Sequence, residues 1–481
     1  MVRLQLVLGL VLSAVLTASA QAPDTLWTRT FGGNDYESPG WIEPAHDSGF
    51  VIAGYTRSFG AGEDDMYVLK INPDGSQAWA YTYGGDGTDD AYDIKRTHDG
   101  CYIVAGWSNS YSAYTSKFEL MKITASGEFI WRHDYGPDTS ANYGFGVCQV
   151  LDGGFILVGD VYCHTIYGYD WDTYVIKTDE SGNLLNEYQI VKANTQGSFR
   201  VIATQDGGAM MVRGTGSFWI AKLDAMGDTV WTRGYGGVSD CNSIIQLADG
   251  GYAAFGNRDR GYGIEDQFWL IRLDPEGGIL WDHYYGGTDP DQGDCVQETY
   301  DHGFIMVGHM YPENLPFDVS IVRADSLGNQ LWSTHFGGPN SDFGCAVQCT
   351  PDSGYVVLGR TPDSTGTLYD LYLIRLGADT LFNTGVDPEP DPLPKTVTLL
   401  QNYPNPFNPA TVISYSIPKP MAVTLSIYNI VGQRVARLDE GMQQTGKHSV
   451  KWDAAGFPSG IYFARLESGD YSQSIMIVLM K

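Results

Sequence analysis

Basic residues are scarce in this sequence. Its 481 residues include 29 Lys and Arg against 57 Asp and Glu, so the formal net charge at pH 7 is -28. A charge of this sign and size repels phosphate backbones and anionic lipid head groups, and it favours solubility and divalent cations. We therefore expect no nucleic acid among the partners of this protein.

Long apolar runs are also scarce. The run from Leu4 to Leu16 is shorter than the roughly 18 residues that a membrane-spanning helix needs, and no other stretch approaches that length. It follows Arg3 and precedes Ala18-Ser19-Ala20, the order of charge, apolar segment and small-residue cleavage site found in secretory signal peptides. The sequence predicts a cleaved signal peptide over residues 1–20 and no transmembrane span.

Cysteine is present but is not arranged as a framework. None of the seven cysteines forms a Cys-x-x-Cys pair or a zinc-binding spacing. They are Cys101, Cys148, Cys163, Cys241, Cys295, Cys345 and Cys349. We expect most of them to be small apolar fillers in packed strands. One bridge, for instance between Cys295 and Cys345, stays open in an oxidising compartment.

Motifs of known catalytic chemistry are missing. The sequence has no Gly-x-Ser-x-Gly elbow, no His-Glu-x-x-His, no P-loop and no dinucleotide glycine fingerprint. It implies no cofactor, although calcium could bind acidic clusters through their oxygen atoms. The clusters are Asp86 to Asp93, Asp289-Pro-Asp291 with Asp294, and Asp170-Trp-Asp172. None has the full calcium loop, so solvated loop residues are the simpler interpretation, and we expect binding rather than catalysis.

What is present is a repeat. The 59 glycines, 31 tyrosines and 12 tryptophans indicate short strands joined by tight turns, and hence an all-β fold. A glycine-containing turn that begins with Asp recurs at intervals of 43 to 54 residues, at Asp47, Asp99, Asp152, Asp206, Asp249, Asp301 and Asp352. A period near 50 residues with strand-like segments is typical of propeller blades.

Each repeat contains four predicted strands, and the seventh lacks its fourth. A fourth-type strand, Thr25 to Gly33, stands alone ahead of the first hairpin. We predict that this strand pairs with the strand around Leu373 and closes a seven-bladed β-propeller over residues 21–382. The segment Asp379-Thr-Leu-Phe382 resembles a fourth strand too and could compete for the same place.

Two side-chain types recur in phase with the repeat. A base near the end of every third strand favours structural ion pairing over an anion-binding ring, since binding sites usually break symmetry. These bases are Lys70, Lys122, Lys177, Lys222, Arg272, Arg323 and Arg375. A tryptophan in most fourth strands indicates packing between blades. One fourth strand has Leu184-Leu185 where the tryptophan is expected.

A proline-rich and acidic linker over residues 383–396 separates the repeats from residues 397–481, which are predicted to form a small immunoglobulin-like β-sandwich. Short motifs are concentrated in this tail. They include Tyr403, Pro404, Asn405, Pro406, Phe407, Asn408 and Pro409 in one run, followed by Gly432, Gly460 and Tyr462. With these motifs the tail resembles the C-terminal sorting domain of type IX (Por) secretion cargo. The resemblance implies the type IX secretion machinery as a partner, and a secreted or cell-surface location that is reached through the periplasm.

Aromatic residues that break the phase of the repeat are the candidate binding residues. Tyr167, Tyr169, Trp171 and Tyr262, together with Tyr111 and Tyr114, are predicted to lie in long loops between second and third strands. We expect a secreted or surface binding protein whose ligand is a glycan or another protein. The alternative is a propeller-based polysaccharide lyase or glycoside hydrolase, which would need unlike catalytic groups at one end of the channel.

Overall fold

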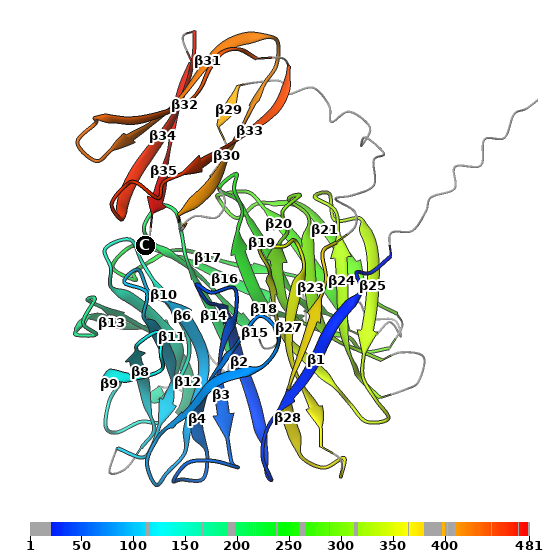
Figure 1. Cartoon of the computed structure of the whole chain (residues 1–481). Helices are drawn as coiled ribbons and strands as arrows, with labels where there is room; N and C mark the ends of the chain where they lie inside the picture. Colours follow the sequence, from blue (N-terminus) through cyan, green and yellow to red (C-terminus); the bar gives the residue numbers. More distant parts are fainter. Residues whose placement is uncertain are drawn as a thin grey trace, which may run out of the picture.

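The protein is built from strands and turns (Figure 1). The computed structural model describes residues 21–479 apart from 112–114, 166–167, 191–197, 215, 217, 237–238, 260–265, 288, 312–315, 364, 380–396, 400–401, 403–406, 408, 444 and 470. No helix in this described part is long and apolar enough to cross a membrane. The all-β fold class predicted from composition is confirmed.

The described body comprises seven four-stranded antiparallel sheets, the blades. The first blade has β2 (Glu37–Pro44), β3 (Phe50–Thr56), β4 (Asp65–Ile71) and β5 (Gln77–Tyr83), and the second has β6 (Asp89–Arg96), β7 (Tyr102–Ser108), β8 (Lys117–Ile123) and β9 (Phe129–Tyr135). The third has β10 (Asn142–Gln149), β11 (Phe155–Thr165), β12 (Gly168–Thr178) and β13 (Leu184–Ile190). The fourth has β14 (Ser198–Ala203), β15 (Ala209–Gly214), β16 (Phe218–Leu223) and β17 (Thr229–Tyr235).

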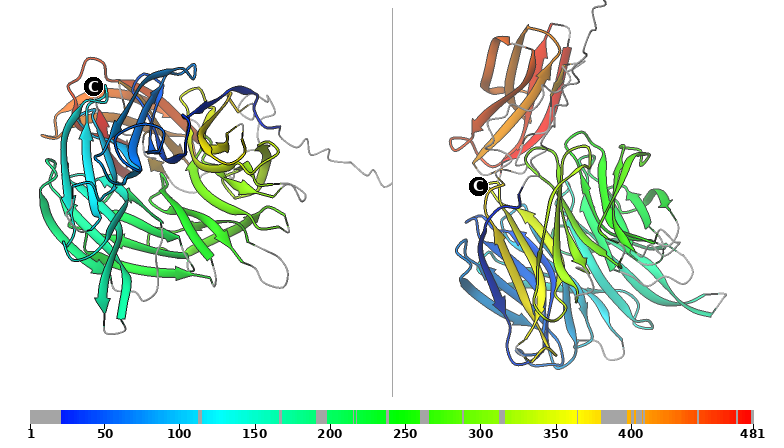
Figure 2. Two further views of the ribbon diagram at one scale, coloured as in Figure 1. Left: turned by 90° about the horizontal axis from the view of Figure 1, so that it is seen from below. Right: turned by 90° about the vertical axis from the view of Figure 1, so that its right-hand side faces the viewer.

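The remaining blades follow the same plan. The fifth has β18 (Ser239–Gln246), β19 (Tyr252–Arg258), β20 (Gln267–Leu273) and β21 (Ile279–Tyr285), and the sixth has β22 (Gln292–Glu298), β23 (Phe304–Met310), β24 (Asp318–Ala324) and β25 (Gln330–Phe336). The seventh has β26 (Phe343–Cys349), β27 (Tyr355–Pro362), β28 (Tyr369–Leu376) and β1 (Thr25–Phe31). The first strand of each blade contacts the first strand of the next, and β26 contacts β2, so the ring is closed (Figure 2).

Closure uses both ends of the body. In the seventh blade the sheet order is β1-β28-β27-β26, with Arg29 opposite Leu373 and Trp27 opposite Arg375. The predicted pairing of the N-terminal strand is therefore confirmed. Asp379, from the competing segment, instead lies buried and accepts hydrogen bonds from Trp332 Nε1 at 3.3 Å and the Tyr355 hydroxyl at 3.1 Å. Residues 380–382 lie outside the described part of the chain.

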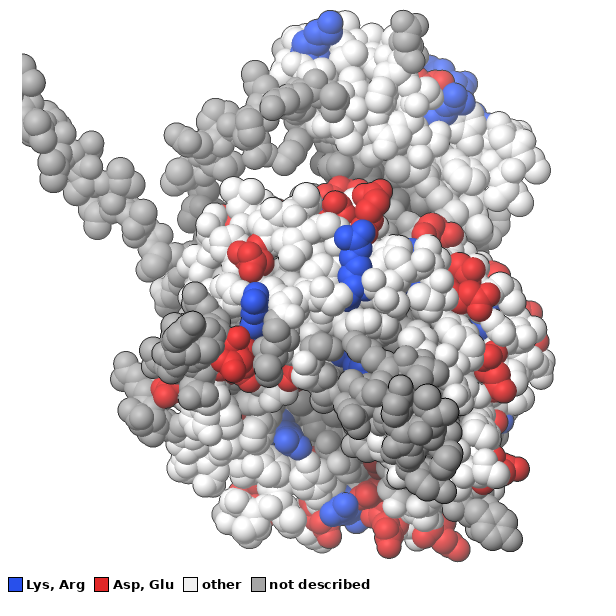
Figure 3. All heavy atoms as spheres, turned by 180° about the vertical axis from the view of Figure 1, so that it is seen from behind, with Lys and Arg blue, Asp and Glu red and all other residues white. Residues whose placement is uncertain are grey.

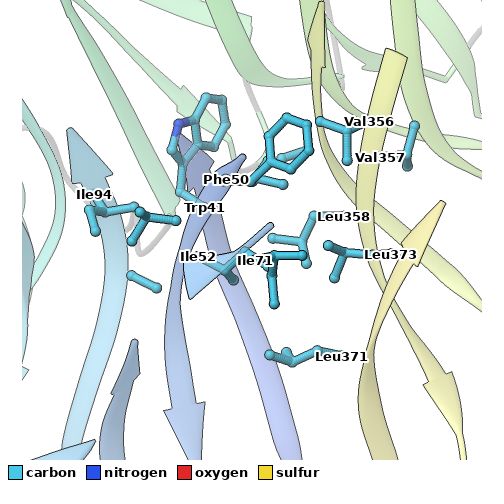
Figure 4. Close-up of a cluster of buried hydrophobic side chains, with 14 of the residues drawn as sticks. Trp41, Phe50, Ile52, Ile71, Ile94, Val356, Val357, Leu358, Leu371 and Leu373 are labelled. Atoms are coloured by element: carbon cyan, nitrogen blue, oxygen red, sulfur yellow. The ribbon is translucent and has the colours of Figure 1, made fainter. Parts of the chain in front are cut away.

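The core lies between the blades. At the closing seam, Leu358 and Leu373 of the seventh blade belong to one buried cluster with Ile52 and Ile71 of the first (Figure 4). All four side chains are fully buried. Truncating one such residue to Ala costs about 2–5 kcal/mol. Second and third strands are buried on both faces because each blade is covered by a neighbour on either side.

The outer rim carries a second seam. Trp79 of β5 packs against the turn glycine of the next blade, Gly127, where an added Cβ would lie 3.0 Å from the indole. The Tyr135 hydroxyl likewise donates to the carbonyl of Gly182 at 2.6 Å. The repeated tryptophans therefore do lie between blades, though most are half-buried at the rim. In β13 the register places Asn186, rather than Leu184 or Leu185, opposite Lys177 where the other blades have tryptophan.

Ion pairs tie the third strand of each blade to its own hairpin turn. The nitrogen-to-oxygen distances are 2.8 Å for Lys70–Asp47, 2.7 Å for Lys122–Asp99, 2.9 Å for Lys177–Asp152, 2.8 Å for Lys222–Asp206, 2.5 Å for Arg323–Asp301 and 2.6 Å for Arg375–Asp352, and Arg272 pairs with Asp249. Burial opposes ionisation of Asp99, but hydrogen bonds from Lys122 and Thr97 outweigh it and lower the pKa to about 2. The structural interpretation of these bases is confirmed.

The tail is a sandwich of two sheets with its own buried cluster. One sheet has the order β29-β30-β33 and the other β32-β31-β34-β35. The strands are β29 (Thr398–Leu399), β30 (Ala410–Ile417), β31 (Met421–Asn429), β32 (Arg434–Gln443), β33 (Gly446–Asp453), β34 (Gly460–Ser468) and β35 (Tyr471–Leu479). Leu425, Trp452 and Leu466 are among the side chains buried between the two sheets.

We predict that a body lacking residues 21–33 exposes the hydrogen-bonding edge of β28. An open edge of this kind pairs with other chains, so the truncated body should melt at a lower temperature and self-associate in size-exclusion chromatography. A synthetic peptide of residues 24–33 should restore both properties, because it supplies the missing strand. A truncated body that stays monomeric and melts like the intact one would contradict this.

Candidate functional site

The seven repeats become unlike one another at one end of the ring. We call this end, where second strands connect to third strands, the loop face. The residue eight positions after the turn Asp differs in every blade: Tyr55, Trp107, Asp160, Gly214, Asn257, His309 and Arg360. We call these residues the variable ring. Since the rest of the repeat is so regular, the loop face is where unlike groups gather, as a binding site requires.

The centre of the ring is crossed by an arginine. Arg200 of β14 donates to the carbonyl of Tyr92 at 3.1 Å and to the carbonyl of Gly40 at 3.2 Å. Its guanidinium also lies over the Trp41 ring, 4.5 Å from the centroid, and Lys95 approaches the same ring to 4.2 Å. These contacts join the innermost strand of the fourth blade to those of the first and second. The Arg200 side chain therefore spans part of the channel at this level.

Aromatic rings cluster on the loop face at the second and third blades. Trp107 meets Tyr143 edge-on at 4.8 Å, and Tyr143 stacks on Trp171 at 5.1 Å between ring centroids. Tyr162 lies 5.0 Å from Trp171 and is 36% exposed. The four rings come from four strands, β7, β10, β11 and β12. We call them the aromatic platform.

The structure places the predicted candidate residues unevenly. Trp171 and Tyr169 lie within β12 rather than in a loop, because the β11–β12 hairpin continues as paired strand up to Thr165 and Gly168. The expectation of a long loop there is wrong. Trp171 joins the aromatic platform, whereas the side chain of Tyr169 and the whole of Tyr167, Tyr262 and Tyr114 lie outside the described residues. Tyr111 is 47% exposed and is covered by the Arg132 guanidinium at 3.3 Å from its ring centroid.

A second aromatic group surrounds Arg360 at the sixth, seventh and first blades. The guanidinium lies 4.7 Å from the Phe343 ring centroid and 5.1 Å from that of Tyr369, and Nη1 donates to the Tyr36 hydroxyl at 2.5 Å. His309 lies 4.9 Å from the ring of Phe343. The loop face thus presents Arg, His and aromatic side chains together, a mixture that can orient a ligand with rings and polar groups.

One carboxyl on the loop face has a strongly shifted proton affinity. Asp90 is the second residue of β6, the innermost strand of the second blade, and is 5% exposed. Burial, with the nearby Asp64 and Asp89 carboxylates, raises its pKa to about 7, although a hydrogen bond from Tyr92 at 3.3 Å opposes the shift. The Oδ1 atom of Asp90 is buried without a hydrogen-bond partner. Such a group can exchange a proton near neutral pH.

Some acids named in the sequence clusters accept hydrogen bonds from backbone amides. Asp89 accepts a hydrogen bond from the amide of Gly85 at 2.9 Å, and Asp291 accepts one from Gly287 at 3.2 Å, so both cap the glycine loop that leads into their own strand. Within the described residues, no three His, Cys, Asp or Glu side chains converge as a metal site. The six cysteines whose side chains are described, including Cys295 and Cys345, are free thiols.

A groove of about 770 Å³ lies between the outer strands of the second and third blades. Tyr135, Tyr174 and Glu187 are among its lining residues. The Tyr174 hydroxyl donates to Glu187 across it. The groove contains neither the aromatic platform nor any member of the variable ring.

The motif residues of the tail that the structure describes hold strands together. Phe407 is 2% exposed, and its amide donates to the carbonyl of Val478 at 2.9 Å. Tyr462 is buried against Trp452 and donates to the Pro458 carbonyl at 2.8 Å. Pro409 is exposed, and Gly432 has a φ of 77° in a turn. Tyr403, Pro404, Asn405, Pro406 and Asn408 lie outside the described residues.

The acidic character of the chain is visible on its surface. On the face shown in Figure 3, acidic side chains are more widespread than basic ones on the body, and basic side chains occur on the tail. Residues 397–481 contain seven Lys and Arg and five Asp and Glu, so the acidic excess lies ahead of the tail. The two parts therefore differ in charge as well as in fold.

Comparison with known proteins identifies the tail. The family model described as "Secretion system C-terminal sorting domain" matches residues 401–480. No curated protein matches the chain.

Solved structures resemble the chain only distantly. PorZ, a surface component of the type IX secretion system of Porphyromonas gingivalis, is 10% identical with a TM-score of 0.36, over 92% of this chain and 70% of its own. A protein of unknown function from Bacteroides caccae is 12% identical with a TM-score of 0.35, over 52% of this chain and 82% of its own.

Replacing Asp90 by Asn should change how stability depends on pH. Burial raises the pKa of this carboxyl to about 7 in the folded state, against an ordinary value of 3.8 for Asp. Between these values the folded state holds the proton and the unfolded state does not, so the contribution of Asp90 to stability is present below about pH 4 and is lost as pH rises to about 7. Asp90→Asn should therefore be more stable than the wild type at pH 8, by up to a few kcal/mol, and should melt at a higher temperature. At pH 4 the two proteins should melt at nearly the same temperature. If the two proteins differed in melting temperature by the same amount at pH 4 and at pH 8, the raised pKa of Asp90 would be contradicted.

Proposed function

Since residues 401–480 belong to the secretion system C-terminal sorting domain family, we propose that this protein is a type IX secretion cargo whose propeller binds a carbohydrate on its loop face. The sorting domain implies contact with the secretion machinery and delivery to the cell surface or the surroundings. Passage through the periplasm behind a cleaved signal peptide, and the ligand itself, are parts of the proposal.

The observation that carries the binding site is the aromatic platform. Trp107, Tyr143 and Trp171 are half-buried, so each ring is fixed by its neighbours and still reaches solvent. Large rigid rings of this kind contribute much contact area at little cost in conformational entropy. Sugar rings have apolar faces and hydroxyl edges, and they suit a surface of aromatic rings interspersed with polar groups.

The variable ring supports a ligand with several different polar groups. The His309 Nδ1 lies 3.3 Å from Asp294 Oδ2, and the Asn257 side chain donates to Asp266 Oδ2 at 3.2 Å. The Oδ1 of Asn257 and the Nε of Arg360 are buried without hydrogen-bond partners. Buried polar atoms of this kind need an explanation such as ordered water or a bound group. Hydroxyl-rich ligands can supply both donors and acceptors.

A second candidate function rests on Asp90. Its raised pKa, its free Oδ1 and the neighbouring Tyr92 hydroxyl are features expected of a proton-transferring group in a polysaccharide lyase or glycoside hydrolase. The test is direct. Purified wild-type body and Asp90→Asn should be incubated with the glycans that the body retains, and product release should be followed. Turnover that disappears in Asp90→Asn would establish the enzyme, and its absence would leave binding.

We predict that Trp171→Ala weakens binding of the retained glycan about tenfold or more, since stacked aromatic anchors dominate the energy of such interfaces. Affinity should be measured by calorimetry on residues 21–395 after screening a glycan panel. Phe129→Ala is the matched control, because Phe129 is 58% exposed on the outer strand β9. Equal losses in both variants, or retention of proteins and of no glycan, would overturn the carbohydrate assignment.

We further predict that deleting residues 397–481 blocks export and leaves a folded body inside the native host. The tail has its own core, so its removal should not unfold the propeller. Cell fractions and culture medium should be compared by immunoblot, with the melting temperature of the purified truncated body as the folding control. Truncated protein reaching the outside in normal amounts would contradict the sorting role.

A further inference from the structure

The turn between β31 and β32 is a well-ordered structure that exposes two aliphatic side chains. Asn429 Oδ1 accepts hydrogen bonds from the amides of Val431 at 3.2 Å and Gln433 at 2.9 Å. The amide of Gly432 donates to the carbonyl of Asn429 at 2.9 Å, and Gly432 takes a φ of 77° that favours glycine. Within this fixed turn Ile430 is 72% exposed and Val431 is 78% exposed.

The geometry of this turn does not require aliphatic residues at positions 430 and 431. The propeller contains the same turn at Asp179 to Asn183, where the Asp179 carboxylate accepts from the amides of Ser181 at 2.9 Å and Asn183 at 2.8 Å, and Gly182 has a φ of 82°. There the two tip positions are Glu180 and Ser181. Five further turns of this pattern carry Pro73-Asp74, Ala125-Ser126, Ala225-Met226, Pro275-Glu276 and Ser326-Leu327. None of them pairs two branched aliphatic residues.

The exposed pair continues onto the outer face of the larger tail sheet. Tyr428 of β31 lies directly opposite Phe463 of β34, so both side chains share a face. Phe463 is 37% exposed, and Ile461, two residues away on the same face, is 39% exposed. We call Tyr428, Ile430, Val431, Ile461 and Phe463 the tail patch. A contiguous exposed apolar surface is typical of an interaction site.

Charge indicates what the tail patch contacts. Arg434 follows the turn and is exposed. Arg465, 44% exposed on the same strand as Phe463, pairs with Glu467 at 3.3 Å, so its charge is already offset within the tail. The tail has more basic than acidic residues, in contrast to the chain as a whole. A partner that covers these aliphatic side chains therefore needs an apolar pocket, and acidic groups at its margin would complement Arg434.

We propose that the tail patch, with Ile430 and Val431 at its tip, is the contact by which the sorting domain docks into an apolar, acid-rimmed pocket of the secretion machinery. This inference rests on the proposed export function. It adds the surface of the tail that is recognised and the chemistry of the partner that recognises it.

The test exchanges the tip for the pair that the propeller already uses. The double variant Ile430→Glu and Val431→Ser carries the residues of the matching turn at Glu180 and Ser181, so the turn should keep its fold. We expect export of the full chain in the native host to fall about tenfold, the effect of losing ~1.4 kcal/mol of binding. Arg434→Glu should reduce export in the same direction, since it would repel the acidic rim.

Met442→Ser is the matched control. Met442 is 69% exposed on the same sheet, but it pairs with Ala422 at the far end of β31 from the turn. It should be exported like the wild type, and all variants should melt like the wild type after purification. Normal export of the double variant, while deletion of residues 397–481 blocks export, would overturn this inference alone. Normal export after the deletion would overturn the export function too.

Discussion

Closure of the ring is the constraint on which the body depends. Every blade has apolar residues on both faces, and each face is covered only because a neighbouring blade lies against it. A row of such sheets would leave two apolar faces in water, whereas a ring leaves none. The antiparallel pairing of β1 with β28 is the point at which the row becomes a ring. The buried Leu373 and Ile52 then meet across a seam between blades whose strands come from opposite ends of the body.

Regularity and irregularity in this repeat serve different purposes. The turn aspartates and the bases that pair with them are the same in kind in every blade, and they fix the hairpins. The variable ring, by contrast, holds seven different residues at one level of the structure. Uniform positions keep the blades superimposable, so a change at one position of one blade alters the loop face without disturbing the ring. The scaffold and the recognition surface are thus separated by position within a single repeat.

The fold was predictable because its sequence signals repeat at a regular interval. Much of the candidate site could not be predicted, because each of its sequence signals occurs only once. The turn aspartates, the strand at Trp27 and the ion pairs all follow from counting residues. The register of β13 does not follow from counting residues. Leu184 and Leu185 resemble the expected tryptophan in apolar character, but Asn186 occupies its place. The sequence predicts Trp171 in a loop, whereas the paired strands of the hairpin extend beyond it. The variable ring could have been found by comparing residues eight positions after each turn Asp, whereas contacts such as Arg200 on Trp41 depend on the closed ring.

The placement of β1 in the seventh blade affects the order in which the chain can fold. Trp27 emerges early in synthesis, yet its partner Arg375 appears 348 residues later. Contacts of such high sequence separation form late and slow the folding of β-rich domains. Until the last blade is available, the first strand has no sheet to join, and the propeller cannot become fully cooperative.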